Sequence, residues 1–315
     1  MNILVTGANG QLGKCFFDVV DNDHHKKHNF FFTGREDLDI RKRDDIIEYI
    51  EKNNIDAVIN FAAYTNVEQA EDDINGAFLA NSFAPSLFAE LMKDRGGIFI
   101  HISTDYVYHP YEGWDGSPFD EDCIDFEYMH KTSISGSDKL CVYGSSKLAG
   151  ESVINLVGGN YLIIRTSWLY SAYGNNFVTK VLKKIENARS GEKLKFVCDQ
   201  VGTPTCAHSL ATFIYSLINY DDIKFYLPNV LNYSDKGVCS WYDFAKAIHE
   251  HGIWNTYPVI EPCYSDEFVS KVKRPHYSVM SKRKLRTVFE DFDNTRDWRE
   301  NLVFTLGLIE ENNEK

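Results

Sequence analysis

The chain has 315 residues, 43% of them hydrophobic, and a formal net charge of −13. This length and apolar content are sufficient to bury a sizeable core, in one large domain or in two joined domains. The acidic balance argues against general nucleic-acid binding, which needs a basic face, and against docking on an anionic membrane surface. Any anionic ligand must therefore be held by a local site.

Cysteine spacing and the lack of targeting signals indicate an unanchored protein of a reducing compartment. No basic segment followed by an apolar stretch opens the chain, and no apolar run approaches the roughly 18 residues of a membrane span. The seven cysteines are never spaced C-x-x-C, which indicates neither a disulfide framework nor a zinc site. The polar stretch at 21–29 carries three histidines that could bind a metal, but it is typical of a solvated loop. We expect a cytoplasmic protein with no membrane or nucleic-acid partner.

Apolar and amphipathic segments alternate over the first 165 residues. Continuous apolar strands separated by amphipathic helices predict a doubly wound parallel sheet covered on both faces, the α/β Rossmann class. In chain order the predicted strands are Asn2–Thr6, Asn29–Thr33, Asp56–Phe61, Gly97–Ser103 and Tyr161–Thr166, and the predicted helices are Gln11–Val20, Asp44–Asn53, Ala77–Asp94 and Tyr143–Val157.

The alternation becomes looser after Trp168, which favours a smaller α/β substrate-binding domain. We predict a Rossmann domain at 1–167 and a mainly substrate-binding domain at 168–315, with the chain returning to the first domain around 192–220. No low-complexity linker separates the halves, so they are expected to share an interface. The predicted helices here are Asn176–Ala188, His208–Asn219 and Trp241–Glu250, and the predicted strands are Leu194–Cys198 and Val230–Tyr233.

The first strand is followed at once by TGANGQLG, in which Gly7, Gly10 and Gly13 are spaced GxxGxxG before a predicted helix. Glycines in this place allow a tight turn and let a pyrophosphate approach the backbone. The free N–H groups and the dipole of the helix N-terminus favour an anion. A lone glycine triplet is weak evidence, but between a strand and a helix it predicts dinucleotide binding.

The end of the second strand, FFTGRED, indicates which dinucleotide is preferred. Rossmann proteins that prefer NAD usually carry an acidic residue here for the ribose 2′-hydroxyl. This chain offers Thr33, Gly34 and Arg35 instead. A guanidinium can accept the 2′-phosphate of NADP, so we predict NADPH as cofactor with NADH also accepted, although Arg35 could equally point into solvent.

The stretch VYGSSKLAGE at 142–151 places Tyr143 four residues before Lys147 at the start of a predicted helix. This spacing puts both side chains on one helix face, close enough for an ammonium to act on a phenol. The spacing recurs at positions 220 and 224 and at positions 242 and 246, so context must select the functional pair. Only Tyr143 follows a strand of the first half, and that strand ends in Ser103 and Thr104, at the edge where open α/β sheets bind ligands.

Six motifs in order carry a resemblance to a known family. TGANGQLG, NFAAYTNVEQAE, STDYVY, YGSSKLAGE, RTSWLY and DQVGTPT resemble those of the extended short-chain dehydrogenase/reductases. Within that superfamily the chain is most similar to the dTDP-4-dehydrorhamnose reductases. The similarity runs from residue 1 to about residue 210, and more thinly through KRPHYSVM near Arg274. It implies reduction of the C4 keto group of dTDP-4-dehydro-L-rhamnose, with a nucleotide sugar as substrate.

The resemblance implies a catalytic role for Thr104, Tyr143 and Lys147. A free tyrosine has a pKa of about 10, and a neighbouring Lys147 ammonium is expected to lower it toward the working range of a general acid. Tyr143 would protonate the alkoxide, and Thr104 would polarise the carbonyl. Lys147 would also hold the nicotinamide ribose. Ser103 is the rival for the role of Thr104, because alternate strand residues face opposite sides of the sheet.

The remaining binding residues are carried over from the family by motif, and each could instead serve packing. The pyrophosphate would be bound by Gly10, Gln11 and Leu12. The adenine would be bound by Asp39 and Ile40. The ribose side of the cofactor would be bound by Ala62, Ala63 and Tyr64. Asp105, Tyr106 and Trp168 would contact the sugar, and Arg274, beside Lys271 and Lys273, would bind the substrate diphosphate.

Three departures from the family pattern bear on these expectations. The interval between Thr104 and Tyr143 is long and holds a turn-rich segment at 111–139, which is typical of a lid. KRPHYSVM ends in Val279 and Met280, where the family has Leu-Asp. Some members dimerise around magnesium held partly by an acidic residue of the first helix, but Lys14 and Cys15 stand there, so we predict no metal site and leave a homodimer open.

Two other functions stay open at this point. Another nucleotide-sugar epimerase or reductase of the superfamily would share these motifs, and an epimerase would retain its oxidised cofactor. A non-catalytic NADP-binding regulatory subunit, like that of methionine adenosyltransferase, also shares the sequence pattern. Such a subunit need not keep Thr104, Tyr143 and Lys147 together, and this chain keeps all three.

Overall fold

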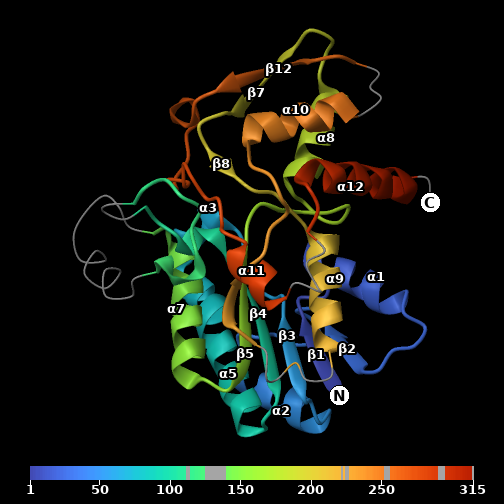
Figure 1. Cartoon of the computed structure of the whole chain (residues 1–315), viewed down its shortest axis with the longest axis vertical. Coiled ribbons are helices and arrows are strands. Elements are labelled where there is room, and N and C mark those ends of the chain that lie inside the picture. The colour runs from blue at the N-terminus through green and yellow to red at the C-terminus, as the bar shows by residue number, and fades with distance from the viewer. Residues whose placement is uncertain are drawn as a thin grey trace.

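Within the part of the chain that the structure describes, six parallel strands form a central sheet in the order β10-β5-β4-β3-β1-β2 (Figure 1). This computed structural model describes residues 1–110, 114–124, 140–220, 223, 227–251, 256–289 and 295–313. The predicted parallel sheet is confirmed. Its strands are β1 (Asn2–Thr6), β2 (Asn29–Thr33), β3 (Ala57–Asn60), β4 (Ile98–Thr104), β5 (Asn160–Thr166) and β10 (Asn229–Asn232).

Helices cover both faces of this sheet, which explains why its strands are apolar at successive positions. Ile3 and Val5 of β1 pack into one core cluster, and Leu4 between them packs into another on the opposite face. The first cluster includes residues of α1 (Gln11–Asp21) and α9 (Ala207–Ile218). The second includes residues of α2 (Arg43–Lys52), α5 (Ala84–Asp94) and α7 (Val142–Val157).

The helix predicted at Ala77–Asp94 is interrupted. The structure has α3 (Val67–Ala70), α4 (Ile74–Phe78), a π-helical turn η1 (Leu79–Phe83) and then α5. Pro85 stands in the first turn of α5, and a proline has no N–H to complete the regular bonding of the turn before it. Single π-turns inside helices commonly mark functional sites, and Asn81 of η1 hydrogen-bonds the backbone of Tyr64, which lines the cavity described below.

A second group of elements packs around its own apolar cluster, which includes Tyr170, Phe244 and Trp298. These elements occupy the upper part of Figure 1, above the sheet. The strands are β6 (Leu169–Tyr170), β7 (Lys193–Val197), β8 (Val201–Gly202), β9 (Thr205–Cys206), β11 (Cys239–Ser240) and β12 (Val259–Cys263). The helices are α8 (Phe177–Asn187), α10 (Trp241–His251), η5 (Ser265–Glu267) and α12 (Trp298–Asn313), and α11 (Arg283–Val288) lies nearer the sheet.

The chain crosses back to the sheet between these elements. Helix α9 packs beside α1, and β10 pairs with β5 in register, with Val230 opposite Ile163. The strand predicted at Val230–Tyr233 is therefore present and forms an edge of the main sheet. The division of the chain at residue 167 into two domains stays a prediction.

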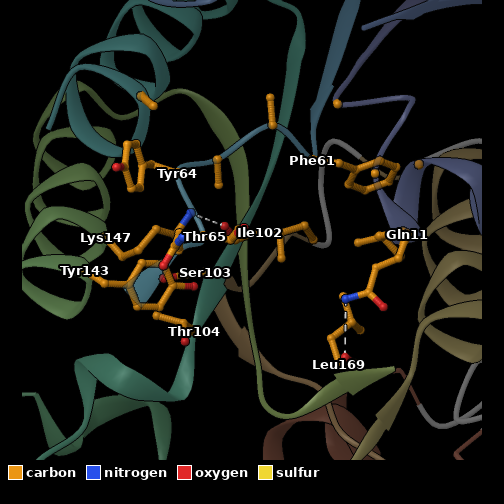
Figure 2. Close-up of a pocket in the computed structure, with 18 of the residues that line it drawn as sticks. Gln11, Phe61, Tyr64, Thr65, Ile102, Ser103, Thr104, Tyr143, Lys147 and Leu169 are labelled. Carbon is orange, nitrogen blue, oxygen red and sulfur yellow. Dashed lines mark hydrogen bonds between the residues drawn. The ribbon is translucent and has the colours of Figure 1, made fainter. Parts of the chain in front are cut away.

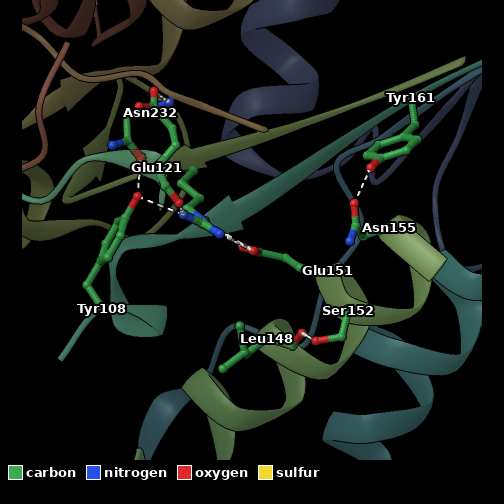
Figure 3. A network of polar contacts seen from close by, with 9 residues as sticks. Tyr108, Glu121, Leu148, Glu151, Ser152, Asn155, Tyr161 and Asn232 are labelled. Carbon is green, nitrogen blue, oxygen red and sulfur yellow. Dashed lines mark hydrogen bonds and ion pairs between the residues drawn. The ribbon is translucent and has the colours of Figure 1, made fainter. Parts of the chain in front are cut away.

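A buried ion pair fastens α7 to β5, as Figure 3 shows. The guanidinium of Arg165 meets the Glu151 carboxylate at 2.7 Å, and both side chains are only 2% exposed. Arg165 also donates to the Tyr108 hydroxyl at 2.8 Å and to the Glu121 carbonyl at 2.9 Å. Tyr108 in turn donates to the Asn232 side chain at 2.7 Å. The network ties together α7, β5, β10 and the short η3 helix (Glu121–Cys123).

Candidate active site

A cavity of about 920 Å³ opens at the carboxyl ends of the parallel strands. It lies where the strand order reverses around β1, which is where open α/β sheets bind ligands. Almost every residue predicted for the site lines it. These are Gly7, Gly10, Gln11, Leu12, Gly13, Arg35, Asp39, Ile40, Ala62, Ala63, Tyr64, Thr104, Asp105, Tyr106, Tyr143, Lys147 and Trp168.

The turn between β1 and α1 can be built only with glycine. Gly7 has a φ of +70°, and a Cβ there would lie 2.6 Å from the Ala62 nitrogen. A Cβ at Gly13 would lie 2.4 Å from the Gly7 carbonyl oxygen. Helix α1 begins after Gly10 with no side-chain cap, so its first N–H groups are available to an anion. The turn and helix thus fit a pyrophosphate.

The side chain of Gln11 links two segments that line the cavity. Its amide donates to the Leu169 carbonyl at 3.3 Å and accepts from the Ser171 hydroxyl at 3.3 Å, as the right side of Figure 2 shows for Leu169. The side chain therefore ties α1 to the segment that follows β5. Its backbone N–H remains part of the anion-binding helix end.

Two arginines of the segment between β2 and α2 line the cavity, where the adenosine half of a dinucleotide would lie. Arg35 lines the cavity and is exposed, and its role toward a 2′-phosphate stays a prediction. Arg41 also lines it, and its guanidinium bonds the Asp39 carboxylate at 2.6 Å. This contact lowers the pKa of Asp39 to about 2. Arg41 was missed by the sequence analysis, although the run of basic residues at 41–43 was a signal.

A buried asparagine, Asn81, hydrogen-bonds the backbone of the loop after β3. Asn81 of η1 accepts from the Tyr64 N–H at 2.8 Å and donates to the Tyr64 carbonyl at 3.0 Å. Its amide also donates to the Ser146 hydroxyl of α7 at 3.0 Å. Asn81 thus connects the backbone of Tyr64 to α7. No motif or spacing in the sequence pointed to Asn81.

Helix α7 and strand β4 bring the predicted catalytic residues together. Figure 2 shows Tyr143 and Lys147 reaching from α7 toward Ser103 and Thr104 at the end of β4. The Thr104 hydroxyl donates to the Asp105 carboxylate at 3.1 Å, whereas the Ser103 hydroxyl has no partner among the described residues. Both rival hydroxyls line the cavity, so the choice of Thr104 over Ser103 stays a prediction.

Three buried hydroxyls that face the cavity have no hydrogen-bond partner within the described part of the chain. They belong to Tyr64, Ser103 and Thr166, and all three residues line the cavity. Buried polar groups are rarely left unpaired in folded proteins. Together with the glycine turn, they fit a polar ligand such as the nicotinamide and ribose of a dinucleotide. Thr166 was not predicted.

Burial, more than charge, sets the protonation of these groups. It raises the pKa of Tyr143 above its usual range, and the hydrogen bond with Thr104 only partly opposes this. It lowers the pKa of Lys147 to about 7, opposed by the charge of Glu151. It raises the pKa of Asp105 to about 6. The expectation that Lys147 lowers the pKa of Tyr143 was wrong for this structure, because the lysine is itself desolvated and bonds His101 and the Ile102 carbonyl instead.

An aromatic platform closes the sugar side of the cavity. Trp168 adopts a φ of +47°, which is unusual for a residue with a side chain, and its ring stacks on Trp241 at a centroid distance of 3.5 Å. Gly202 makes room for it, since a Cβ there would lie 2.7 Å from the indole. The Tyr106 ring meets Tyr143 edge-on at 5.4 Å. Trp241 was missed by the sequence analysis.

A second cavity of about 1070 Å³ lies beyond Tyr106. Arg274 lines it and donates to the Tyr106 hydroxyl and to the Glu68 carboxylate, each at 3.4 Å. Tyr106 lines the first cavity, so this contact joins the two. The second cavity combines aromatic and cationic side chains, namely Phe177, Trp241, Lys180, Lys184, Lys195, Lys271, Lys273 and Arg274.

Several other sequence expectations can be placed. Helix α10 carries Tyr242 and Lys246, whose spacing equals that of the active-site pair, and neither lines a cavity named above. In the described ranges no three His, Cys, Asp or Glu side chains gather as for a metal ion. No described helix is both long and apolar enough to cross a membrane. Of the predicted lid at 111–139, residues 111–113 and 125–139 lie outside the described residues.

Comparison with known proteins agrees with this arrangement. The family model of the RmlD substrate binding domain matches residues 1–309. The spore coat polysaccharide biosynthesis protein SpsK of Bacillus subtilis (strain 168) is 32% identical over 300 residues, 95% of each chain. The solved structure of a dTDP-4-dehydrorhamnose reductase from Clostridium acetobutylicum ATCC 824 is 33% identical, with a TM-score of 0.82 over 98% of this chain and 100% of that one.

A solved structure that contains the cofactor is also similar. The dTDP-4-dehydrorhamnose reductase of Bacillus anthracis str. Ames, in complex with NADP, is 29% identical, with a TM-score of 0.80. It covers 97% of this chain and 98% of its own. The match of the family model and these similarities both extend over nearly the whole chain, and therefore over both cavities. The chain belongs to the RmlD substrate binding domain family.

Proposed function

We propose that the protein reduces the C4 keto group of dTDP-4-dehydro-L-rhamnose to give dTDP-L-rhamnose, with NADPH as the preferred cofactor. The observation that carries this function is the meeting of Thr104, Tyr143 and Lys147 at the end of β4, on a cavity with a glycine-lined dinucleotide turn. The similar reductases support the substrate, and the Bacillus anthracis reductase was solved with NADP. A cytoplasmic location and a homodimer remain expectations.

The residues of this chain suit the reductive direction. A bound reduced nicotinamide would supply the hydride to the carbonyl carbon. Tyr143 donates a proton to the carbonyl oxygen as charge develops there, and this requires a phenol that is still protonated at neutral pH. Its raised pKa meets that requirement. Thr104, which lines the cavity beside Tyr143, polarises the same carbonyl.

The two cavities correspond to the two ends of a nucleotide sugar. Asp105, Tyr106 and Trp168 surround the reacting end with polar and aromatic groups. Arg274 stands at the junction, and the basic, aromatic cavity beyond it suits a diphosphate and a base. This arrangement supports a nucleotide sugar rather than a small keto compound.

Replacing Arg274 with Ala is expected to raise the KM for the nucleotide sugar about tenfold or more with little change in kcat. The reason is that Arg274 would bind the diphosphate equally in the ground and transition states. Steady-state kinetics with saturating NADPH measure the effect. Arg286→Ala, an exposed arginine on α11 that lines neither cavity, is the matched control. An unchanged KM in Arg274→Ala would place the diphosphate elsewhere.

Replacing Arg35 with Ala is expected to weaken NADPH about tenfold or more and to leave NADH unaffected, because only NADPH has the 2′-phosphate. Titration of each cofactor by fluorescence or calorimetry measures this directly. Arg43→Ala removes a neighbouring exposed cation that does not line the cavity. Equal losses for both cofactors would show that Arg35 does not read the 2′ position.

The function itself is tested by NADPH and NADH consumption with dTDP-glucose and the dehydratase and epimerase that generate the keto sugar. Oxidation of the cofactor with formation of dTDP-L-rhamnose is expected. Turnover with a different 4-keto sugar would identify another reductase of the superfamily. A cofactor that stays bound and oxidised through dialysis would indicate an epimerase, and a folded, NADPH-binding protein without any turnover would indicate a regulatory subunit.

A further inference from the structure

Two stacked tryptophans belong to different cavities. Trp168 lines the first cavity, and Trp241 lines the second. Their indole planes are inclined by only 8°, with the ring centroids 3.5 Å apart. Trp241 therefore covers one face of the Trp168 ring, and the pair forms a wall that the two cavities share.

Trp168 has an unusual backbone conformation. Its φ of +47° lies in the left-handed region, which is unfavourable for a residue with a side chain and persists only where the surroundings hold it. The Trp168 carbonyl accepts from the Thr205 N–H at 3.3 Å, and the Ser167 hydroxyl donates to the Thr203 carbonyl at 2.6 Å. These bonds fix the main chain but not the side-chain torsions. The direction of the indole thus depends on what packs against the ring.

A pair of short strands in the upper part of Figure 1 brings two neighbours to that ring. Strand β8 carries Gly202, and β11 pairs with it antiparallel, with Cys239 opposite Gly202. A Cβ at position 202 would lie 2.7 Å from the Trp168 ring, so glycine lets β8 approach the ring closely. Trp241 follows β11 directly, as the first residue of α10. The same strand pair therefore places both neighbours of the indole.

The start of α10 is fixed by a reciprocal pair of hydrogen bonds. The Ser240 hydroxyl accepts from the Asp243 N–H at 3.1 Å, and the Asp243 carboxylate accepts from the Ser240 N–H at 2.9 Å. A capping box of this kind satisfies two backbone donors at a helix start. The Trp241 ring also contacts Phe177, at a centroid distance of 4.5 Å. Trp241 is thus held independently of Trp168 and can serve as a fixed surface for its ring.

We propose that Trp241 is a positioning residue for the substrate: by stacking on Trp168, it holds that indole where it contacts the sugar. This inference rests on the proposed function, in which Trp168 binds the sugar end of the nucleotide sugar. The energy that an aromatic pair gains beyond its buried area depends on ring geometry, so the stacking favours one orientation of the indole. Trp241 acts on the sugar through Trp168, because Trp241 is not among the described residues that line the first cavity.

The stacking can be tested in solution without any substrate. Ring protons that lie over the face of another aromatic ring resonate at lower chemical shift than usual. In protein labelled with ¹³C-tryptophan, the Trp168 ring signals are assigned by their loss in Trp168→Phe. They should lie at low chemical shift in the unmodified protein and return toward the usual range in Trp241→Leu. Trp168 signals that do not move in Trp241→Leu would overturn the proposal.

Two ligands that differ only in the sugar test the effect on the substrate. In Trp241→Leu, calorimetry should show an affinity for dTDP-L-rhamnose that is about three- to tenfold lower, because the geometry of an aromatic pair is lost. The affinity for dTDP should change by less than about twofold. Trp241→Phe keeps a flat ring and should recover most of the lost affinity. Equal losses for both ligands would mean that Trp241 contacts the nucleotide directly, and would overturn the positioning role.

Gly202→Ala disturbs the same ring from a second position. The added Cβ would lie 2.7 Å from the Trp168 ring, so the indole must shift although Trp241 is intact. The affinity for dTDP-L-rhamnose should fall by a factor similar to that in Trp241→Leu. Because both changes act on one ring, the double variant should lose much less than the product of the two single losses. Losses that multiply would show that the two residues do not act through Trp168.

Phe244→Leu is the matched control. Phe244 lies on the same helix as Trp241 and in the apolar cluster against which Trp241 packs, and it is not among the described residues that line either cavity. Its replacement removes a buried ring and should lower the melting temperature without changing the affinity for either ligand. If Trp241→Leu gave this same pattern, its role would be structural only and the proposal would fail.

Failure of this inference can be distinguished from failure of the proposed function. If the unmodified protein neither reduces the keto sugar nor binds dTDP-L-rhamnose, the proposed function is wrong, and the Trp168 ring signals still decide whether Trp241 orients the indole. If the unmodified protein reduces the keto sugar and Trp241→Leu keeps full affinity for dTDP-L-rhamnose, only this inference fails. Preserved binding of NADPH shows that each variant is folded.

Discussion

Tyr143→Phe is expected to lower the rate of keto-sugar reduction by about 10²- to 10⁴-fold, with cofactor binding preserved. The variant lacks only the hydroxyl that donates the proton. The phenylalanine ring keeps its edge-on contact with Tyr106, so the fold should persist. Stopped-flow or steady-state oxidation of NADPH gives the rate, and a binding titration gives the affinity for the cofactor.

Tyr242→Phe provides the control for this prediction. Tyr242 precedes Lys246 by the same four residues on α10, and neither residue lines a cavity of the site. Its replacement should leave the rate within about twofold of the original, as is usual for a residue without contact to the reacting atoms. Comparable losses in both variants would mean that Tyr143 is not the acid.

Glu151→Gln is expected to lower the free energy of unfolding by about 3–5 kcal/mol, because it leaves the Arg165 guanidinium buried without a counter-charge. Both side chains are 2% exposed, so water cannot take the place of the carboxylate. The hydrogen bonds from Arg165 to Tyr108 and to the Glu121 carbonyl remain, but neither partner carries a negative charge at neutral pH. Urea unfolding followed by fluorescence measures the loss.

Two further variants distinguish the cost of burying a charge from the cost of breaking an ion pair. Glu267→Gln breaks an ion pair with Lys195 that is equally short, 2.7 Å, but about half exposed, and should cost much less. The double variant Glu151→Leu with Arg165→Met should be more stable than Glu151→Gln, because no buried charge is left unpaired. If Glu151→Gln and Glu267→Gln cost the same, desolvation of the arginine would not explain the effect.

Local patterns were sufficient for the elements of the sheet. Strands β1 and β4 are buried on both faces, and this burial requires apolar residues at successive positions, a pattern that the sequence displays directly. The turn at Gly7 is also local, since its φ of +70° is a backbone conformation that favours glycine. The break of the predicted helix at η1 could have been anticipated from Pro85.

Contacts between distant segments were not predictable in this way. The residue types of β10 are typical of a strand, but only tertiary packing places this strand beside β5. Arg165 and Glu151 are separated by 14 positions in the chain, on a strand and a helix, and no spacing rule pairs them. The same holds for Arg274, which reaches Tyr106 from 168 positions away.

The sequence by itself determined the parallel sheet and the glycine turn, because both depend on short-range geometry that residue type and spacing express. Most of the residues that line the first cavity were predicted from the resemblance of their motifs to a known family. Only the tertiary structure decided the protonation states of the side chains that line that cavity. Burial raises the pKa of Tyr143 and lowers that of Lys147. Desolvation depends on every surrounding group at once, so it arises only when the chain is folded.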